Sequence, residues 1–197
     1  MSDPETLEAY AGRVDQYLAL VKPEPAASLI AFADALPPGG KVLDLGCGPG
    51  HAARYLASRG FDTHAWDLSP EMIAAVGDAP SLKARVAGFD DLVSQDDYDG
   101  IFASFSLLHA PKSAMPRHMA SIGAALKPGG IFHLGMKLGE GEERDSIGRF
   151  YAYYTRHELL GFLKEQGLHP VWEREGEEKG LAGKTDPFLL IRAVKHG

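Results

Sequence analysis

One stretch in the first quarter of the chain constrains its fold more than any other. The short, mainly apolar run at residues 42–45 (Val-Leu-Asp-Leu) is typical of a buried strand of a parallel sheet. Glycines follow at alternate positions, 46, 48 and 50, and a helical pattern begins at His51. Strand, glycine turn and helix in this order form the layout of a nucleotide-binding crossover. Because glycine lacks a Cβ, a ligand is able to lie directly against the backbone at such a turn.

The spacing of the glycines distinguishes between cofactor classes. Dinucleotide-binding enzymes use the pattern G-x-G-x-x-G, whereas here the third glycine comes one residue early and His51 stands in the place of the expected glycine. Asp44 precedes the first glycine by two residues. The string Asp-Leu-Gly-Cys-Gly-Pro-Gly at 44–50 resembles motif I of the class I S-adenosylmethionine (SAM) methyltransferases. More of that family's pattern follows in order and covers most of the chain.

The resemblance implies a fold, a cofactor and a set of contacts. The implied fold is α/β and Rossmann-like: three layers, doubly wound, around a mostly parallel seven-stranded sheet with an antiparallel last strand. The implied cofactor is SAM, and the implied activity is methyl transfer to an acceptor. From motif I itself, the resemblance implies cofactor contacts at these positions: Asp44, Gly46, Cys47, Gly48 and Gly50.

Length, charge and cysteine content bound the remaining possibilities. At 197 residues the chain is expected to form one domain, residues 1–197, with one sizeable core. The net charge of −7 argues against a nucleic-acid backbone or an anionic membrane as the main partner. Cys47 is the only cysteine, which excludes an internal disulfide and a cysteine-based metal cluster. No signal-peptide pattern or membrane-spanning apolar run is found, so a cytoplasmic location is expected.

Two helices are expected before the glycine turn, at 5–21 and 26–36, because apolar residues recur there at helical spacing. The resemblance implies that this N-terminal region, residues 1–38, covers the active site. Tyr10 and Tyr17 are therefore candidates for the wall of a substrate pocket. Simple packing of both rings against the domain is the favoured interpretation, since aromatic residues at helical spacing usually belong to the core.

Asp67, at the end of a strand expected at 61–67, is the candidate ligand of the cofactor's ribose. It lies about 20 residues past the glycine turn, where a carboxylate accepts hydrogen bonds from two ribose hydroxyls. The alternative is a role at the start of the next helix, for which Ser69 is the expected cap and Pro70 the first residue. The resemblance implies that Leu68 and Met72 flank the adenine.

The third strand, expected at 83–87, is followed by a departure from the family pattern. The family usually has an acidic residue there that accepts from the adenine amino group, but Gly88 occupies this position. Asp90 or Asp91 could take that role, or the backbone and ring of Phe89 could hold the adenine. A third possibility is that the two aspartates are only solvated turn residues.

The fourth strand, expected at 98–105, leads to the predicted active site, because ligands bind outside the carboxyl ends of parallel strands. The resemblance implies contacts from Ser104 and Phe105 to the methionine end of SAM, and it makes His109 a candidate for the acceptor pocket. A structural, hydrogen-bonded His109 is the alternative. The signature N/D-P-P-Y/F is absent, which disfavours exocyclic amines of bases and side-chain amides as acceptors.

The second half of the chain completes the pattern. A helix at 113–126, the string Lys-Pro-Gly-Gly at 127–130 and a strand at 131–137 again look like this family, and His133 within that strand is expected to be packed. Residues 139–145 are expected to be a mobile loop. Thr155 with Glu158 predicts a helix start, and strands at 168–174 and 188–194 are expected to be joined by a charged turn at 175–186.

The expected chemistry needs no metal, and no metal-ligand pattern is present in the sequence. If the acceptor is a hydroxyl or a protonated amine, His109 is the candidate general base. If the acceptor is a carboxylate, Arg149 and Lys137 are the candidate cationic clamp, and Arg149 with nearby tyrosines could also bind an aromatic acceptor.

The function favoured by the sequence is SAM-dependent methylation of a small molecule, because the chain is short and acidic. A non-catalytic SAM-binding protein and an NAD-dependent oxidoreductase are the alternatives. A macromolecular acceptor is a variant of the favoured function, and the sequence makes no prediction of oligomeric state.

Overall fold

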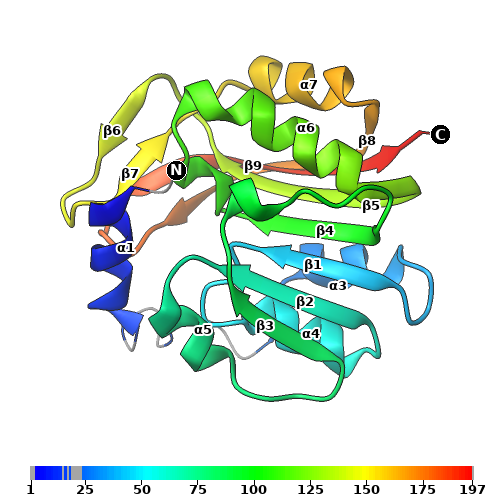
Figure 1. Cartoon of the computed structure of the whole chain (residues 1–197). Coiled ribbons are helices and arrows are strands. Elements are labelled where there is room, and N and C mark those ends of the chain that lie inside the picture. Colours follow the sequence, from blue (N-terminus) through cyan, green and yellow to red (C-terminus); the bar gives the residue numbers. More distant parts are fainter. Residues whose placement is uncertain (1–2, 15, 17, 19–23, 197) are drawn as a thin grey trace.

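The computed structural model describes residues 3–14, 16, 18 and 24–196. Its centre is a seven-stranded sheet with the strand order β3-β2-β1-β4-β5-β9-β8 (Figure 1). Strands β1 to β5 pair in parallel, and β9 is antiparallel to both of its neighbours, β5 and β8. This arrangement confirms the fold class predicted from the sequence. The strands are β1 Lys41–Leu45, β2 Asp62–Asp67, β3 Leu82–Val86, β4 Tyr98–Ser104, β5 Leu126–Lys137, β8 Leu168–Lys179 and β9 Thr185–Lys195.

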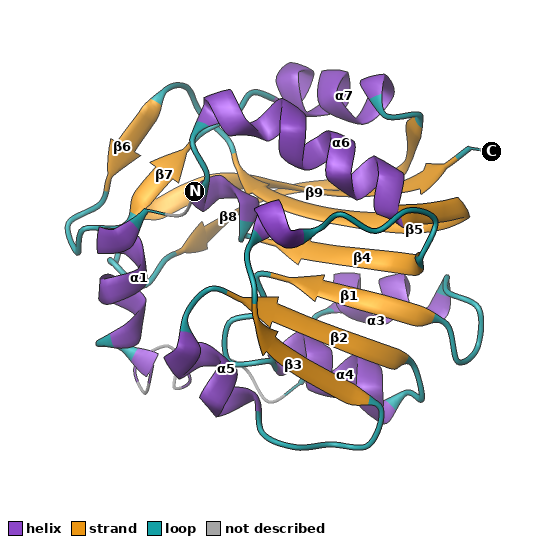
Figure 2. Cartoon of the chain, viewed as in Figure 1, coloured by secondary structure: helices purple, strands orange, loops and turns teal. Residues whose placement is uncertain are grey.

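Helices cover both faces of the sheet (Figure 2). They are α1 Pro4–Ala11, α3 Ala27–Asp34, α4 His51–Ser58, α5 Pro70–Val76, α6 Met115–Ala125 and α7 Arg156–Glu165. Successive side chains of β1 point to opposite faces of the sheet. Val42 packs in one apolar cluster with α3 and α4, and Leu43 packs in another with α6 and α7. Short 3₁₀ turns follow β3 at Phe89–Asp91 and β4 at Leu107–His109, and a third, at Lys112–Ala114, precedes α6.

His133 of β5 is buried within the sheet and is 1% exposed. Its ring stacks on Phe102 of β4 with the centroids 4.4 Å apart. Burial lowers the pKa of His133 to about 3, because the interior disfavours the charged imidazolium. The expectation of a packed histidine at this position is confirmed.

Two regions differ from the predicted elements. The segment 139–145, expected to be a loop, contains strand β6 (Glu142–Arg144), which pairs antiparallel with β7 (Phe150–Ala152). The charged segment 175–186, expected to be a turn, mostly extends β8 and β9, and the turn itself is confined to 180–184. In both places charged residues lie on exposed strands, whose polarity resembles that of a loop.

The N-terminal helix is described only in part. Helix α1 starts at the cap Asp3, whose side chain accepts from the backbone N–H of Thr6, and it ends before Gly12. Of the helix predicted at 5–21, residues 15, 17 and 19–21 lie outside the described residues, and so does the predicted wall position Tyr17. In Figure 1 the arrowheads of β1, β2 and β4 point toward α1, which lies beside the β6–β7 hairpin. No helix in the part of the chain that the structure describes has the length and apolarity needed to cross a membrane.

Candidate functional site

Two adjoining cavities lie at the carboxyl ends of the parallel strands. The glycine-turn cavity, of about 100 Å³, is lined by the turns after β1 to β4 and by α1. The outer cleft, of about 910 Å³, opens beside it toward β5, β7, β8 and β9. Of the predicted site residues, these line the glycine-turn cavity: Gly46, Gly48, Asp67, Leu68, Met72, Phe89, Ser104, Phe105 and His109. These line the outer cleft: Asp44, Gly46, Cys47, Ser104, Phe105, His109 and Arg149. Gly50 and Asp90 line neither of the two.

The glycine turn is compact because its glycines adopt conformations that other residues avoid. Gly46 has φ +76°, and a Cβ built there would lie 2.2 Å from the Cβ of Ser106. The Ser106 hydroxyl in turn donates to the carbonyl of Leu45 at 2.6 Å, so the turns after β1 and β4 are fastened together. At Gly50 a Cβ would lie 2.8 Å from Val76 of α5. The glycine at position 50 is therefore explained by packing between α4 and α5.

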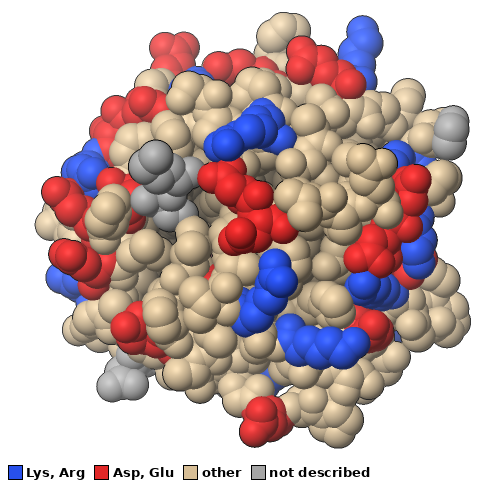
Figure 3. Space-filling view, viewed as in Figure 1, with Lys and Arg blue, Asp and Glu red and all other residues tan. Residues whose placement is uncertain are grey.

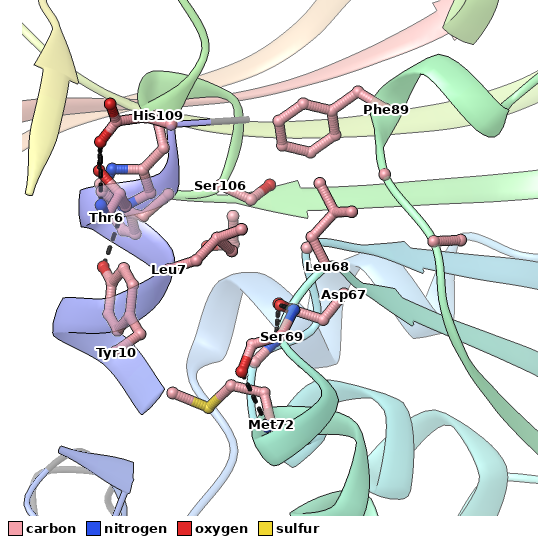
Figure 4. Close-up of a pocket in the computed structure, with 17 residues that line it drawn as sticks. Thr6, Leu7, Tyr10, Asp67, Leu68, Ser69, Met72, Phe89, Ser106 and His109 are labelled. Atoms are coloured by element: carbon pink, nitrogen blue, oxygen red, sulfur yellow. Dashed lines mark hydrogen bonds between the residues drawn. The ribbon is translucent and has the colours of Figure 1, made fainter. Parts of the chain in front are cut away.

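Asp67 at the end of β2 has the role at the start of α5 that the sequence left open, and it also lines the glycine-turn cavity. One carboxylate oxygen accepts from the backbone N–H of Gly48 at 2.9 Å, and the other accepts from the N–H of Ser69 at 2.9 Å. The carboxylate thus joins the glycine turn to the start of α5 while it lines the cavity (Figure 4). Ser69 itself caps α5 by accepting from the N–H of Met72. Burial raises the pKa of Asp67 above its ordinary value.

Gly88, which stands in the place of the expected acid, lies close to a side chain of the opposite turn. A Cβ at Gly88 would lie 2.7 Å from the end of the Leu68 side chain, which lines the cavity from the opposite turn. The backbone N–H of Gly88 donates to the carboxylate of Asp91 at 2.7 Å. Asp90 lies outside the cavity, and its carboxylate forms an ion pair with Arg117 at 2.8 Å. Of the three residues predicted as alternatives, Phe89, Asp90 and Asp91, Phe89 lines the cavity beside Gly88 and the two aspartates do not.

Asp44 supplies a test of whether the site fits a cofactor with an amino-acid end. It is 3% exposed, and its Oδ2 has no hydrogen-bond partner among the described residues. Burial, with a smaller contribution from the charge of Asp67, raises the pKa of Asp44 to about 7. An orphaned, buried carboxylate beside a glycine turn is stabilised by a cationic ligand. The ammonium of the methionine moiety of SAM has the required charge, so the residues fit this cofactor. Neighbouring Cys47 is buried, and burial raises the pKa of its thiol.

Phe105, which follows β4, has an unusual backbone conformation. Its φ of +55° lies in the left-handed region, which typically costs a residue other than glycine about 1–3 kcal/mol. Its N–H donates to the carbonyl of Gly135 of β5, and its ring packs edge-on against Phe188 of β9 with centroids 5.7 Å apart. The strained turn directs Phe105 to the boundary between the two cavities, both of which it lines.

His109, on the 3₁₀ turn after β4, is held by hydrogen bonds at both ring nitrogens. Nδ1 lies 2.7 Å from the carbonyl oxygen of Phe150, which only accepts, so Nδ1 carries the proton. In the neutral ring Nε2 must then accept, and the hydroxyl of Tyr10 donates to it at 2.9 Å. Burial, with smaller contributions from the charges of Arg149 and Lys137, lowers the pKa of His109 to about 4. The imidazole is therefore neutral at physiological pH.

Tyr10 connects His109 to Arg149, the second predicted acceptor-side residue. The Arg149 guanidinium is 3% exposed and donates to the Tyr10 hydroxyl at 3.0 Å. It also forms an ion pair with Asp145 at 2.8 Å. Arg149 therefore faces the outer cleft as part of a hydrogen-bonded chain from Asp145 through Tyr10 to His109. The sequence offered Tyr10 mainly as a packing residue, and this polar chain was not predicted.

Helix α1 is attached to the β6–β7 hairpin at its first turn. Arg144 of β6 donates to both carboxylate oxygens of Asp3, at 2.6 and 2.8 Å. The Thr6 hydroxyl accepts from the backbone N–H of Phe150 at 2.8 Å. Asp3, Thr6 and Tyr10 all line the glycine-turn cavity, and Figure 4 shows Thr6, Leu7 and Tyr10 facing Asp67, Ser69 and Met72 across it. No sequence signal marked Asp3 or Thr6, because their partners lie more than 140 positions away.

The outer cleft contains a buried ion pair between Lys137 and Asp186, of which only Lys137 was predicted from the sequence. Lys137, at the end of β5, donates to the carboxylate of Asp186 on β9. The Lys137 ammonium also lies 4.2 Å from the centre of the Tyr151 ring. Asp186 was assigned to a charged turn and carried no signal, although it is only 4% exposed. Among the described residues no group of three or more His, Cys, Asp or Glu side chains could hold a metal ion.

Comparison with known proteins gives a matching family model and several similar relatives. The family model described as "Methyltransferase domain" matches residues 17–176. Hemagglutinin 1 of Eikenella corrodens is 36% identical over 173 residues, which are 80% of this chain and 55% of the relative. Trans-aconitate 2-methyltransferase of Mycobacterium tuberculosis is 39% identical over 74 residues, 36% of this chain and 28% of the relative. The chain thus spans about half the length of the first relative and about a quarter of the second.

Solved structures share the fold. The 1,6-didemethyltoxoflavin-N1-methyltransferase of Burkholderia thailandensis, solved with 1,6-didemethyltoxoflavin and S-adenosylhomocysteine, aligns with a TM-score of 0.76 at 22% identity. The alignment covers 98% of this chain and 88% of that one. A TehB-like SAM-dependent methyltransferase of Corynebacterium glutamicum aligns with a TM-score of 0.68 at 25% identity, over 98% of this chain and all of that one.

Proposed function

This chain belongs to the family of class I SAM-dependent methyltransferases, and from that premise we propose that it methylates a small-molecule acceptor bound in the outer cleft. Family membership indicates SAM as the cofactor rather than NAD, and an enzyme rather than a binding protein. The observation that carries the proposal is the boundary between the cavities. Gly46, Ser104, Phe105, His109 and Tyr10 line both of them, so a group in one directly faces a group in the other.

We propose that the predicted cofactor residues lining the glycine-turn cavity bind SAM. Asp67 is the candidate for the ribose hydroxyls, and Asp44, which lines the outer cleft next to the glycine turn, is the candidate for the ammonium of the amino-acid end. Leu68, Met72 and Phe89 are the candidates for the adenine. When bound, SAM supplies a methyl group already activated by a sulfonium, so the chain itself has little covalent chemistry to perform. Its contribution is to orient the acceptor, which in favourable cases removes about 7–11 kcal/mol from a barrier.

Helix α1 is the proposed cover of the site. Its side chains Asp3, Thr6, Leu7 and Tyr10 form one wall of the glycine-turn cavity, and its attachment to β6 and β7 holds that wall in place. A closed wall keeps water from the reacting groups. His109, neutral and fixed by Phe150 and Tyr10, is the candidate group for holding or receiving the acceptor's proton at Nε2.

A small acceptor is also consistent with the charges of the surface. The chain carries a net charge of −7, and acidic and basic side chains alternate over the face shown in Figure 3 without a continuous basic region. A nucleic-acid acceptor would be expected to bind through such a region.

The test follows tritiated methyl groups. A cell extract is divided by ultrafiltration into small molecules and macromolecules, and each fraction is incubated with the protein and methyl-labelled SAM. We expect label in the small-molecule fraction. Asp67→Ala should abolish the labelling, whereas Gly60→Ala, at a turn far from both cavities, should preserve it. Label confined to protein or nucleic acid would overturn the proposal.

A further inference from the structure

Two of the cations that line the outer cleft, Arg149 and Lys137, each have a carboxylate partner. Arg149 pairs with Asp145 at 2.8 Å, and Lys137 pairs with Asp186. Lys184, which also approaches Asp186, pairs with Glu143 at 2.8 Å. The clamp of Arg149 and Lys137 that the sequence offered for a carboxylate acceptor is thus already neutralised within the protein.

The whole lining of the cleft has the same balance. Its cationic residues are Lys137, Arg149, Arg174 and Lys179. Its acidic residues are Glu24, Asp44, Glu177, Glu178 and Asp186. An anionic acceptor that enters this cleft loses hydration and meets a lining whose acidic residues are at least as many as its cationic ones, so its binding is disfavoured.

Aromatic rings form the sides of the cleft near the boundary with the glycine-turn cavity. Phe105 and Phe188 pack edge-to-face, and Tyr151 lies beneath the Lys137 ammonium. His109 lies 4.7 Å from Tyr151, measured between ring centroids. A site lined by rings, with a few fixed polar groups, is typical of pockets that bind planar organic molecules.

Lys137 and Asp186 are those fixed polar groups. An ammonium has three N–H donors and Asp186 engages one, while a carboxylate has about four acceptor positions. Side by side at the floor of the cleft, they present a donor next to an acceptor. Such a pair matches the edge of a neutral compound that itself offers an acceptor next to a donor, as a lactam, an enol ketone or a hydroxy-heterocycle does.

From this charge compensation and these aromatic walls, we infer that the acceptor is an uncharged, planar ring compound without carboxylate or phosphate, methylated at a phenol-like O–H or ring N–H. The inference rests on the proposed function and names its substrate class. It also makes Lys137 and Asp186 specificity-determining residues.

The chemistry of the step agrees with a weakly acidic O–H or N–H. A new O–CH₃ or N–CH₃ bond forms from a lone pair of the acceptor as the S–CH₃ bond breaks, and the electron pair of that bond stays on sulfur. The acceptor's proton leaves to water or to Nε2 of His109, which the Tyr10 hydroxyl occupies in this structure. Because burial makes His109 a weak base, an acceptor that readily releases its own proton suits this site.

The experiment compares two probes that share a ring system and a nucleophile. 7-Hydroxy-4-methylcoumarin is uncharged when its phenol is protonated, and 7-hydroxycoumarin-4-acetate adds one carboxylate. Fluorescence titration at mildly acidic pH, with S-adenosylhomocysteine saturating, gives a Kd for each. We expect the uncharged probe to bind at least about tenfold more tightly, because the carboxylate is desolvated without a partner.

Variants test whether the Lys137–Asp186 pair causes the discrimination. Asp186→Asn leaves Lys137 without its carboxylate, so the preference for the uncharged probe should fall by about fivefold or more. Glu178→Gln also removes one carboxylate of the cleft, but at an exposed position, and should leave the preference unchanged.

Three results would overturn the inference: equal or tighter binding of the carboxylate probe, binding of neither probe, or an equal effect of the two variants. Failure of the proposed function would be seen separately, as label in the macromolecular fraction of the extract.

Discussion

The two halves of this site are built in different ways. At the strand ends, the glycine-turn half is organised by backbone: Gly46 and Gly48 have positive φ, and the Asp67 carboxylate accepts from backbone N–H groups on two turns. The outer half is formed by side chains from segments far apart in the sequence, among them Tyr10, Lys137 and Asp186. Backbone geometry tolerates little change, while side chains are replaced without altering the fold. The first half therefore suits a constant cofactor, and the second suits an acceptor that differs between relatives.

The largest effect is expected at the rigid half. Gly46→Ala places a methyl group 2.2 Å from the Cβ of Ser106 at a residue with φ +76°, so the turns after β1 and β4 must separate. We expect the affinity for S-adenosylhomocysteine to fall about 100-fold or more, which is about 2.7 kcal/mol, as measured by calorimetry. Gly60→Ala has a similar φ of +87° and no atom within 4 Å of the added Cβ, so it controls for backbone strain alone. Equal losses of affinity would show that the clash at Ser106 is irrelevant.

The next effect concerns the polar chain of the outer half. Tyr10→Phe leaves the buried Arg149 and Nε2 of His109 each without a hydrogen bond that they have now. We expect the free energy of unfolding, from urea titration, to fall by about 1–3 kcal/mol. Tyr55→Phe is the matched control, since its hydroxyl accepts from Arg59 at an exposed position, and it should cost less than about 0.5 kcal/mol. An unchanged free energy of unfolding in Tyr10→Phe would mean that the hydrogen bonds linking Arg149, Tyr10 and His109 contribute nothing to the stability of the fold.

The two titratable residues Asp44 and His109 should also respond differently to pH. Asp44, with a pKa of about 7, is mostly protonated at pH 6 and mostly ionised at pH 8. Because the ionised form attracts the ammonium of the ligand, S-adenosylhomocysteine should bind up to about tenfold more tightly at pH 8 than at pH 6. His109, with a pKa of about 4, stays neutral throughout this range. Calorimetry across the range should show the trend in the native protein and in His109→Gln, but not in Asp44→Asn. If the pH dependence of the affinity persists in Asp44→Asn, a group other than Asp44 must cause it.

The smallest effect is expected at the attachment of α1. Arg144→Ala removes the ion pair with Asp3, which is largely exposed to solvent, so the equilibrium affinity should change by less than about 1 kcal/mol. We expect dissociation of S-adenosylhomocysteine, followed by stopped-flow fluorescence, to accelerate about three- to fivefold, because α1 opens more often. Arg156→Ala breaks a comparable exposed pair with Glu173 away from both cavities and should change nothing. An unchanged dissociation rate in Arg144→Ala would show that the attachment of α1 does not control the release of the ligand.

The same contrast explains how much could be predicted from the sequence. The cofactor half lies in short continuous motifs, so the glycine turn, Asp67 and the segment from Ser104 to His109 could be located in the sequence, and the fold class came from the resemblance to the family. Gly88 departs from the family pattern, and its proximity to the Leu68 side chain could not be predicted from the sequence. Contacts between two turns leave no local pattern in the sequence from which they could be predicted.

The outer half was predicted less well because its partners are distant in sequence. Arg149 and Lys137 could be named as cations, but their partners Asp145 and Asp186 lay in segments that resembled loops. Strand β6 was missed for the same reason, since the flanking glycines and the exposed acids of 139–145 are typical of a loop. The sequence thus identified cations at the cleft, and the structure shows that their charges are already balanced.

The most direct test of this account is a calorimetric titration of S-adenosylhomocysteine into the native protein, Asp67→Ala and Asp186→Asn, with circular dichroism to verify folding. One variant removes a carboxylate from the glycine-turn cavity, and the other neutralises a carboxylate of the outer cleft. The account predicts tight binding to the native protein, a loss of about tenfold or more (about 1.4 kcal/mol) in Asp67→Ala, and a change within about twofold in Asp186→Asn. Unchanged binding in Asp67→Ala, or an equal loss in both variants, would contradict the division of the site into a cofactor half and an acceptor half.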